Sequence, residues 1–196
     1  MAITLWVATT NQGKLNEFRN LMAERVEIHG LQDLKNYAAP PETGKTFEDN
    51  ARIKARSLKA MRPGTWVVAD DSGLEVEGLG GLPGVHSARY AGDKASDAEN
   101  VAKLLKMLQI RSPGNRTAVF RCVLVAYDPE GREHVLRGEV KGQITPTARG
   151  KAGFGYDPIF APEGHDKTFA ELGSAVKNQI SHRAVAIREL LSLLTS

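Results

Sequence analysis

The chain has a single cysteine among its 196 residues, so an internal disulfide is impossible. This excludes the disulfide-rich secreted domains and gives no sign of an oxidising compartment. No apolar run approaches the ~18–20 residues of a membrane span, and the N-terminus has no basic region followed by a long apolar one. From these absences we expect a soluble, cytoplasmic protein with no membrane partner.

A strong excess of charge of either sign is also absent. The net charge is +3, the pI is about 9.0, and acidic and basic residues are interspersed. Such a mild balance permits an anionic ligand without requiring nucleic acid. With 41% hydrophobic and 25% charged residues, the chain has the composition of an ordinary globular protein. Its length fits a single domain over residues 1–196, or one domain with two lobes.

Hydrophobic periodicity predicts strands and helices in alternation, followed by a β-hairpin and a final helix. Pairs of capping residues predict helix starts at Thr46 and Ser96. This order favours an α/β domain with a mixed sheet. The expected strands cover residues 3–8, 65–70 with a continuation over 74–77, 117–128 and 133–144. The expected helices cover residues 15–22, 46–58, 96–108 and 180–194.

Two adjacent carboxylates, Asp70 and Asp71, follow the apolar run 67–69, and we expect the strand to stop there. Neighbouring acids repel each other unless a cation or hydrogen bonds neutralise them. Magnesium with a phosphate substrate is the obvious candidate, because Mg²⁺ is held by one or two carboxylates plus phosphate oxygens. The alternative is a surface strand that ends in an acidic turn.

A loop at residues 9–14 joins the first strand to the first helix, and it could bind phosphate. The amides at a helix N-terminus attract anions, and Lys14 adds a positive charge. The loop lacks the longer glycine pattern of a Walker A motif, and it could equally be a simple connection. Ser72 and Lys177 are further candidates for phosphate contacts. Glu42 matters only if the fold brings it to Asp71, where the two could share a cation.

Two further segments could recognise a nucleobase. Phe154 and Tyr156 lie among glycines and offer aromatic faces, although an aromatic turn that fills the core is an equal alternative. His182 and Arg183 could read the edge of a base, because Arg donates a rigid fork of hydrogen bonds. Such a pair on a helix is usually only a polar face.

Taken together, these segments resemble the inosine triphosphate pyrophosphatase family, which hydrolyses non-canonical purine nucleoside triphosphates. Six pieces occur in the family's order from residue 8 to residue 183, nearly the whole chain. One position departs from the pattern, because Thr10 stands where the family commonly has glycine. The pieces are Ala-Thr-Thr-Asn-Gln-Gly-Lys, Pro-Glu-Thr-Gly-Lys-Thr-Phe, Ala-Asp-Asp-Ser-Gly-Leu, Leu-Gly-Gly-Leu-Pro-Gly-Val-His-Ser-Ala-Arg-Tyr, Gly-Phe-Gly-Tyr-Asp-Pro and Ser-His-Arg.

The resemblance implies a role for each matched residue. Asp71 would be the general base and would share Mg²⁺ with Glu42, while Asp70 would be a supporting acid. His182 and Arg183 would read the purine edge. The residues implied for the triphosphate are Thr9, Thr10, Asn11, Gln12, Gly13 and Lys14, assisted by Ser72 and Lys177. Those implied for the base pocket are Phe154, Gly155, Tyr156 and Asp157.

The resemblance also implies an elongated mixed sheet flanked by helices, two lobes with a central substrate cleft, and a homodimer. The expected activity is hydrolysis of ITP, dITP and XTP to the nucleoside monophosphate and pyrophosphate, which removes them from the nucleotide pool. Selectivity would follow from the six-position carbonyl of these purines, since a donor such as Arg183 pairs with a carbonyl and opposes the amino group of adenine.

Three alternatives compete with this interpretation. One is the septum-formation-inhibitor type of nucleotide pyrophosphatase, which shares the fold but acts on other bases. Another is a nucleic-acid-binding module, suggested by the pI and by Arg52, Lys54, Arg56 and Lys59, which more simply form the solvated face of an amphipathic helix. The third is an inactive relative, which the intact acids and lysines disfavour.

Overall fold

The computed structural model describes residues 3–22 and 25–195, which form an α/β fold built on a six-stranded sheet. The strands lie in the order β2-β1-β3-β4-β5-β6. Strand β1 pairs in parallel with β2 and β3, whereas β5 and β6 are antiparallel, so the sheet is mixed as predicted. The strands are β1 (Ile3–Val7), β2 (Val26–Gly30), β3 (Trp66–Val76), β4 (Thr117–Tyr127), β5 (Glu133–Ile144) and β6 (Phe160–Pro162).

Five α-helices accompany the sheet in the described ranges. They are α1 (Gln12–Met22), α2 (Phe47–Met61), α3 (Asp97–Arg111), α4 (Phe169–Ile180) and α5 (His182–Thr195). Short 3-10 helices are η1 (Leu31–Asp33), η2 (Glu77–Leu79), η3 (Gly84–Arg89) and η4 (Asp157–Ile159).

Capping boxes start three of the helices. Thr46 and Ser96 cap α2 and α3 as predicted, because each side chain accepts a hydrogen bond from the amide three residues later. Thr168 caps α4 in the same way, with Glu171 as its partner. Helix α4 was not predicted: Lys177 lies within it, and Ser181 separates it from the last helix, α5.

Strand β3 does not stop at the paired acids, which corrects the sequence-based prediction. It continues through Asp70 and Asp71 to Val76. Successive side chains of a strand point to opposite faces, so the two carboxylates are directed away from each other. The continuation therefore resolves the repulsion that the sequence suggested.

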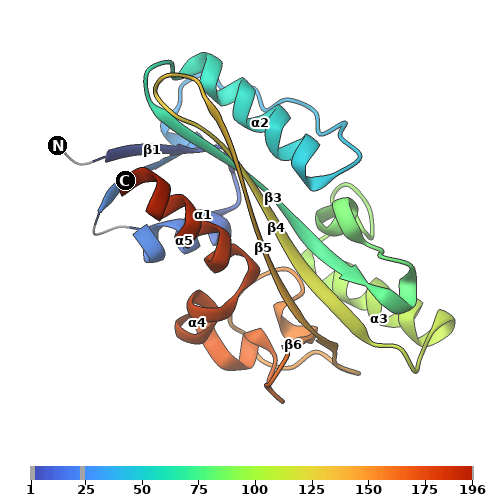
Figure 1. Cartoon of the computed structure of the whole chain (residues 1–196). Helices are drawn as coiled ribbons and strands as arrows, with labels where there is room; N and C mark the ends of the chain where they lie inside the picture. Colours follow the sequence, from blue (N-terminus) through green and yellow to red (C-terminus); the bar gives the residue numbers. More distant parts are fainter. Residues whose placement is uncertain (1–2, 23–24, 196) are drawn as a thin grey trace. The chain divides into compact units, whose positions relative to one another are not determined.

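The chain divides into two compact units, and the first comprises residues 1–71, 122–138 and 183–196. Its sheet segment is covered on both faces (Figure 1). Leu15 and Phe18 of α1 pack with Ile187 and Leu190 of α5 in one apolar cluster. Helix α2 packs its Ala51, Ala55 and Leu58 in a second cluster with Val67 and Ala69 of β3.

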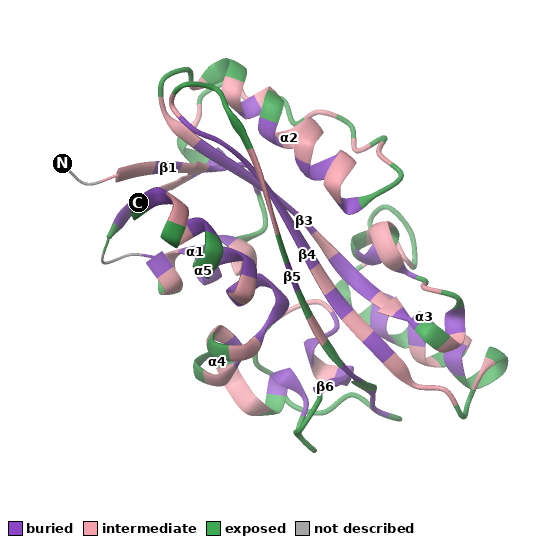
Figure 2. Cartoon of the chain, in the orientation of Figure 1, coloured by how far each residue is buried: buried purple, intermediate pink, exposed green. Residues whose placement is uncertain are grey.

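The second unit comprises residues 72–121 and 139–182. Its core joins Leu104 and Leu108 of α3 to Phe120 of β4, and it also includes Phe160 and Phe169. Strands β3 and β4 carry long buried stretches (Figure 2), consistent with their central places in the strand order. The first unit thus has two apolar clusters and the second has one.

Within the part of the chain that the structure describes, no helix combines the length and apolarity needed to cross a bilayer.

Candidate active site

The predicted phosphate loop runs directly into the first turn of α1. The Asn11 side chain accepts a hydrogen bond from the Lys14 amide at 3.0 Å, and Thr9 Oγ accepts one from the Asn11 amide at 3.1 Å. These two bonds fix the turn that precedes the helix. A helix N-terminus carries partial positive charge, so this end of α1 is suited to an anion. Thr10 and Gln12 also line a hollow of about 190 Å³ beside it.

Thr10 fits this loop without strain. Glycine is needed where φ is positive, but Asn36 is the non-glycine residue with positive φ in the described chain. The departure of Thr10 from the family pattern therefore leaves the backbone of the loop unaffected. Its side chain is exposed at the mouth of the hollow.

Asp70 is surrounded by hydrogen-bond donors on its face of β3. Its carboxylate is fully buried and pairs with Lys14 and, at 2.8 Å, with Nε of Arg183. The Cys122 thiol lies 3.1 Å away, within hydrogen-bond distance of sulfur. Burial alone would raise the pKa of Asp70, but Arg183 and Lys14 outweigh it and hold the pKa well below its usual range. Asp70 is therefore a permanent anion.

Arg183 is more deeply enclosed than the sequence suggested. It is 2% exposed, and besides Asp70 it donates to Glu17 at 2.6 Å through Nη1. Glu17 lies in α1, so this ion pair ties α5 to α1. In this conformation the guanidinium positions Asp70, and its proposed contact with a purine stays a prediction.

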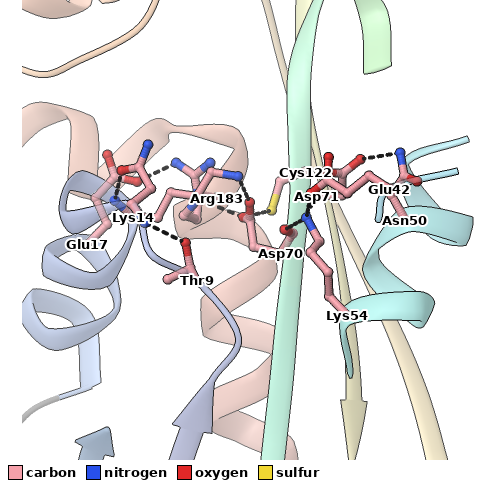
Figure 3. A network of polar contacts seen from close by, with 11 residues as sticks. Thr9, Lys14, Glu17, Glu42, Asn50, Lys54, Asp70, Asp71, Cys122 and Arg183 are labelled. Atoms are coloured by element: carbon pink, nitrogen blue, oxygen red, sulfur yellow. Dashed lines mark hydrogen bonds and ion pairs between the residues drawn. The ribbon is translucent and has the colours of Figure 1, made fainter. Parts of the chain in front are cut away.

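Asp71 points to the opposite face of β3, toward α2 (Figure 3). Lys54 donates to its Oδ1 at 2.9 Å, and the Asn50 amide nitrogen lies 3.3 Å from its Oδ2. Burial raises the pKa of Asp71, and the nearby Lys54 only partly offsets this effect. A carboxylate with a raised pKa is a better proton acceptor than one held ionised by two cations. The structure thus distinguishes two acids that the sequence could not rank.

Glu42 joins Asp71 at this face, as the cation hypothesis requires. Both carboxylates lie 2.9 Å from the same atom, Nζ of Lys54. Although burial opposes it, the two acids raise the pKa of Lys54, which keeps its positive charge. The two carboxylates therefore converge on one cation, and their oxygens are ligands that Mg²⁺ accepts. Among the residues described, no group of three or more His, Cys, Asp or Glu could hold a metal, so a Mg²⁺ here would need phosphate oxygens or water as well.

Sequence reasoning missed Asn50 and Lys54. Lys54 was assigned to a solvated helix face, but its side chain is 14% exposed and bound to two acids. Asn50 is fully buried and accepts from the Gly44 amide at 2.8 Å, which ties the loop of Glu42 to the helix. Their spacing of four residues places both on one face of α2, a signal that is visible once Asp71 is known to face this helix.

The second unit holds the predicted base residues in one segment, residues 154–157. Asp157 is 2% exposed, and its Oδ2 accepts from the Phe154 amide at 2.9 Å. Tyr156 is buried and donates to the Ser87 carbonyl at 2.8 Å. Gly153 has φ of 80°, and a Cβ there would overlap the Asp157 carboxylate. The 154–157 segment is therefore held tightly, while the Phe154 ring stays half-exposed.

Lys177 contacts the 154–157 segment through Asp157 and Phe154. Its ammonium lies 2.5 Å from Asp157 and 4.3 Å from the centre of the Phe154 ring. It is 4% exposed, so in this structure it supports the segment. Its predicted assistance to phosphate binding is not tested by these contacts and stays a prediction.

His182 and Ser72 complete the predicted set. The His182 ring is buried and stacks on Phe120 with ring centres 4.7 Å apart. Ser72 is half-buried and follows Asp71 directly in β3. Their predicted contacts with substrate stay predictions.

Comparisons with known proteins identify the family of the chain. A sequence model of the Ham1 family matches residues 5–193. The chain is 52% identical over 192 residues to the dITP/XTP pyrophosphatase of Bdellovibrio bacteriovorus, which covers 97% of this chain and 96% of that protein. The structure of a HAM1 protein from Coxiella burnetii is similar with a TM-score of 0.88 at 38% identity, over 98% of each chain. The nucleoside-triphosphatase / dITP/XTP pyrophosphatase of Mycobacterium abscessus gives a TM-score of 0.75 at 43% identity, over 99% of this chain and 100% of that one.

Proposed function

The chain belongs to the Ham1 family, and from this premise and the site's geometry we propose that it is a dITP/XTP pyrophosphatase. It hydrolyses ITP, dITP and XTP to the nucleoside monophosphate and pyrophosphate and so removes them from the nucleotide pool. The relatives that match nearly the whole chain carry this activity in their names, which supports the proposal.

The single observation that supports the proposed chemistry is that the Asp70 and Asp71 carboxylates have different surroundings. Asp70 is enclosed by Lys14, Arg183 and Cys122, whereas Asp71 shares its face with Glu42 and Lys54. A proton acceptor needs a lone pair that is not saturated by permanent cations. Asp71 meets this condition better than Asp70, which supports its role as the general base.

In the proposed reaction, water attacks the α-phosphorus of the bound triphosphate. A bond forms between the water oxygen and phosphorus, the bridge to the β-phosphate breaks, and pyrophosphate leaves with the bridging oxygen. Asp71 accepts the proton that the water loses. General-base catalysis of this kind contributes ~10²–10⁴-fold to a rate.

Glu42 and Asp71 would hold Mg²⁺, since their carboxylates already converge on the cationic Nζ of Lys54. When bound, Mg²⁺ neutralises and orients the pyrophosphate group and lowers the pKa of coordinated water. Lys54 adds a positive charge beside the two acids and partly offsets their negative charges when a triphosphate approaches.

We assign the substrate contacts as follows. Residues 9–14 bind phosphate at the N-terminus of α1, and Ser72 and Lys177 assist. Residues 154–157 form the base pocket, where the half-exposed Phe154 ring offers a stacking face. His182 and Arg183 read the six-position of the purine. The finer predictions of a single domain over residues 1–196, two lobes with a substrate cleft, a homodimer and a cytoplasmic location belong to this proposal.

Steady-state kinetics on a nucleotide panel test the function. We expect high kcat/KM for dITP and XTP and values lower by several orders of magnitude for dATP, because a site that pairs with a carbonyl leaves groups unpaired against an amino group. Pyrophosphate and the monophosphate should form in equal amounts. Equal kcat/KM for dATP and dITP would refute the base assignment, and release of inorganic phosphate instead of pyrophosphate would refute the site of cleavage.

A further inference from the structure

Asp97 makes an interaction that the proposed function does not use. It is the first residue of α3, and its side chain is exposed. Its Oδ2 accepts a hydrogen bond from the Gly155 amide at 2.7 Å. This distance is typical of a charge-assisted bond between an amide and a carboxylate. Both residues lie in the second unit, so the contact joins α3 to the 154–157 segment.

The peptide that Asp97 contacts is fixed at both of its polar ends. Its N–H, that of Gly155, donates to Asp97, while its C=O, that of Phe154, accepts from the Asp157 amide at 3.2 Å. Gly155 has φ of 60° and no side chain, so its N–H bond to Asp97 contributes directly to the orientation of this peptide plane. Phe154 Cα belongs to this peptide, so its orientation bears on where the half-exposed Phe154 ring, the proposed stacking surface, is directed.

The rest of this region is anchored by buried groups. Tyr156 donates to the Ser87 carbonyl, and Ser87 Oγ accepts from the Leu74 amide at 2.9 Å. Asn100, in α3, holds the chain after Ser87 through the Ala91 amide at 2.7 Å. Removal of any of these groups would disturb the core. Asp97 differs because its exposed carboxylate can be altered while the core keeps its contacts.

We propose that Asp97 is a positioning residue for base recognition, which fixes the Phe154–Gly155 peptide and thereby the surface on which the purine stacks. This inference rests on the proposed function, because it takes residues 154–157 as the base pocket. In this proposal Asp97 acts through its bond to the Gly155 amide and makes no contact of its own with the reacting phosphorus or the base. Its effect is therefore on binding of the nucleoside and not on the hydrolytic step.

A simple structural role makes a different prediction. An acidic residue in the first turn stabilises a helix through a favourable interaction with the helix dipole. Asp97 has this effect on α3 whether or not it contacts Gly155. Glu99 provides the matched control. It lies in the same turn and accepts from the Ser96 amide at 2.7 Å within the capping box. Loss of Glu99 should weaken the start of α3 without removing the bond to Gly155.

The test compares Asp97→Ala, Asp97→Asn and Glu99→Ala with the wild type. For Asp97→Ala we expect KM for dITP to rise about tenfold, equivalent to ~1.4 kcal/mol of binding, with kcat within about twofold of wild type. Asn keeps an acceptor oxygen without the charge, so Asp97→Asn should give a smaller rise in KM. Amide hydrogen exchange should quicken in peptides that cover residues 153–157. Glu99→Ala should lower Tm and leave both KM and this exchange unchanged.

Each outcome decides between the readings. Unchanged KM and unchanged exchange in Asp97→Ala would overturn the proposal, as would an equal rise in KM for Glu99→Ala. If Asp97→Ala does not fold, Asp97→Asn is compared with Glu99→Ala instead, with a smaller expected rise in KM. A wild-type enzyme that does not hydrolyse dITP or XTP would instead refute the proposed function, and the exchange measurement would still report whether Asp97 holds the segment.

Discussion

Two carboxylates that are neighbours in the sequence have opposite electrostatic environments. Asp70 is a fully buried anion whose charge is balanced by Lys14 and Arg183, so its protonation state does not change near neutral pH. Asp71 has a raised pKa and shares a cation with another acid. The strand achieves this separation by turning successive side chains to opposite faces.

The two acids should respond differently to the same substitution. We expect Asp71→Asn to fold with a Tm near that of wild type and to lose at least ~100-fold in kcat, because the proposed proton acceptor is gone. The measurement is steady-state dITP hydrolysis together with thermal unfolding of the variant. Near-normal turnover in Asp71→Asn would remove this residue from the base role.

Asp70→Asn should act on stability. The substitution leaves the cations Lys14 and Arg183 with one acid, Glu17, in this buried network, and we expect a loss of ~3–5 kcal/mol in the free energy of unfolding at pH 7. The folded-state pKa of Asp70 is lower than its unfolded value near 3.8. Its stabilisation is therefore complete above that unfolded value and is lost as the pH falls through the folded-state value. Denaturant titrations of both proteins should give a difference that is constant from pH 7 to 5 and shrinks below about pH 4; a difference that grows on acidification would contradict the assignment.

Motif and chemistry predicted the two acids, Lys14 and Glu42 as site residues. They did not identify the partners that give each its charge state. Arg183 lies 113 residues from Asp70 along the chain, and no local pattern predicts that it is enclosed with that carboxylate. Lys54 was misassigned because helical periodicity distinguishes apolar from polar faces but does not reveal a buried acid opposite a lysine.

Helix α2 carries the polar side chains that contact Asp71. Its apolar residues pack on β3 through Ala51 and Ala55, and small side chains allow a close approach. Asn50 and Lys54 then reach Asp71 from the same helix. The capping box at Thr46 fixes where this helix starts, and therefore which residues of β3 lie opposite Asn50 and Lys54.

Lys54→Met tests this helix's contribution to chemistry. Lys54 lowers the pKa of Asp71, so its removal should raise that pKa and move the acidic limb of the kcat/KM profile to higher pH. Lys59→Met is the control on the same helix. Lys59 donates to the backbone carbonyls of Thr65 at 2.8 Å and Asp128 at 2.7 Å, and not to Asp71. We expect this control to lose stability and keep the wild-type pH profile. Identical pH profiles for Lys54→Met and wild type would show that Lys54 does not affect the pKa of the proposed proton acceptor.

Element prediction succeeded where local signals were strong and failed where tertiary contacts decide. The starts of α2 and α3 follow from capping residues that act within one turn. The length of β3 does not follow from local signals. Its two adjacent acids indicate a strand end unless the neighbouring strands and the basic side chains that pair with these acids are known. Helix α4 had a local signal, the Thr168 and Glu171 capping box, that the periodicity of the following apolar residues obscured.

For the whole molecule, each unit contains one part of the predicted site. Residues 9–14, Glu42, Asp70 and Asp71 belong to the first unit, and residues 154–157 with Lys177 belong to the second. The first unit has two apolar clusters and the second has one, so each part of the predicted site belongs to a unit with its own apolar core. The order of motifs along the sequence predicted the family but not this partition, because both units combine segments that are distant in sequence.

The convergence of Glu42 and Asp71 on one cation is tested most directly by the magnesium dependence of dITP hydrolysis in Glu42→Gln. Glu48 provides the control, because its side chain is 31% exposed, as is that of Glu42, and it pairs with Arg52 in α2. We expect Glu42→Gln to need at least ~10-fold more Mg²⁺ for half-maximal rate, as when a ligand or its support is lost, with Glu48→Gln unchanged and activity abolished by a chelator. The same Mg²⁺ requirement in Glu42→Gln and wild type, or full activity in the chelator, would contradict the account.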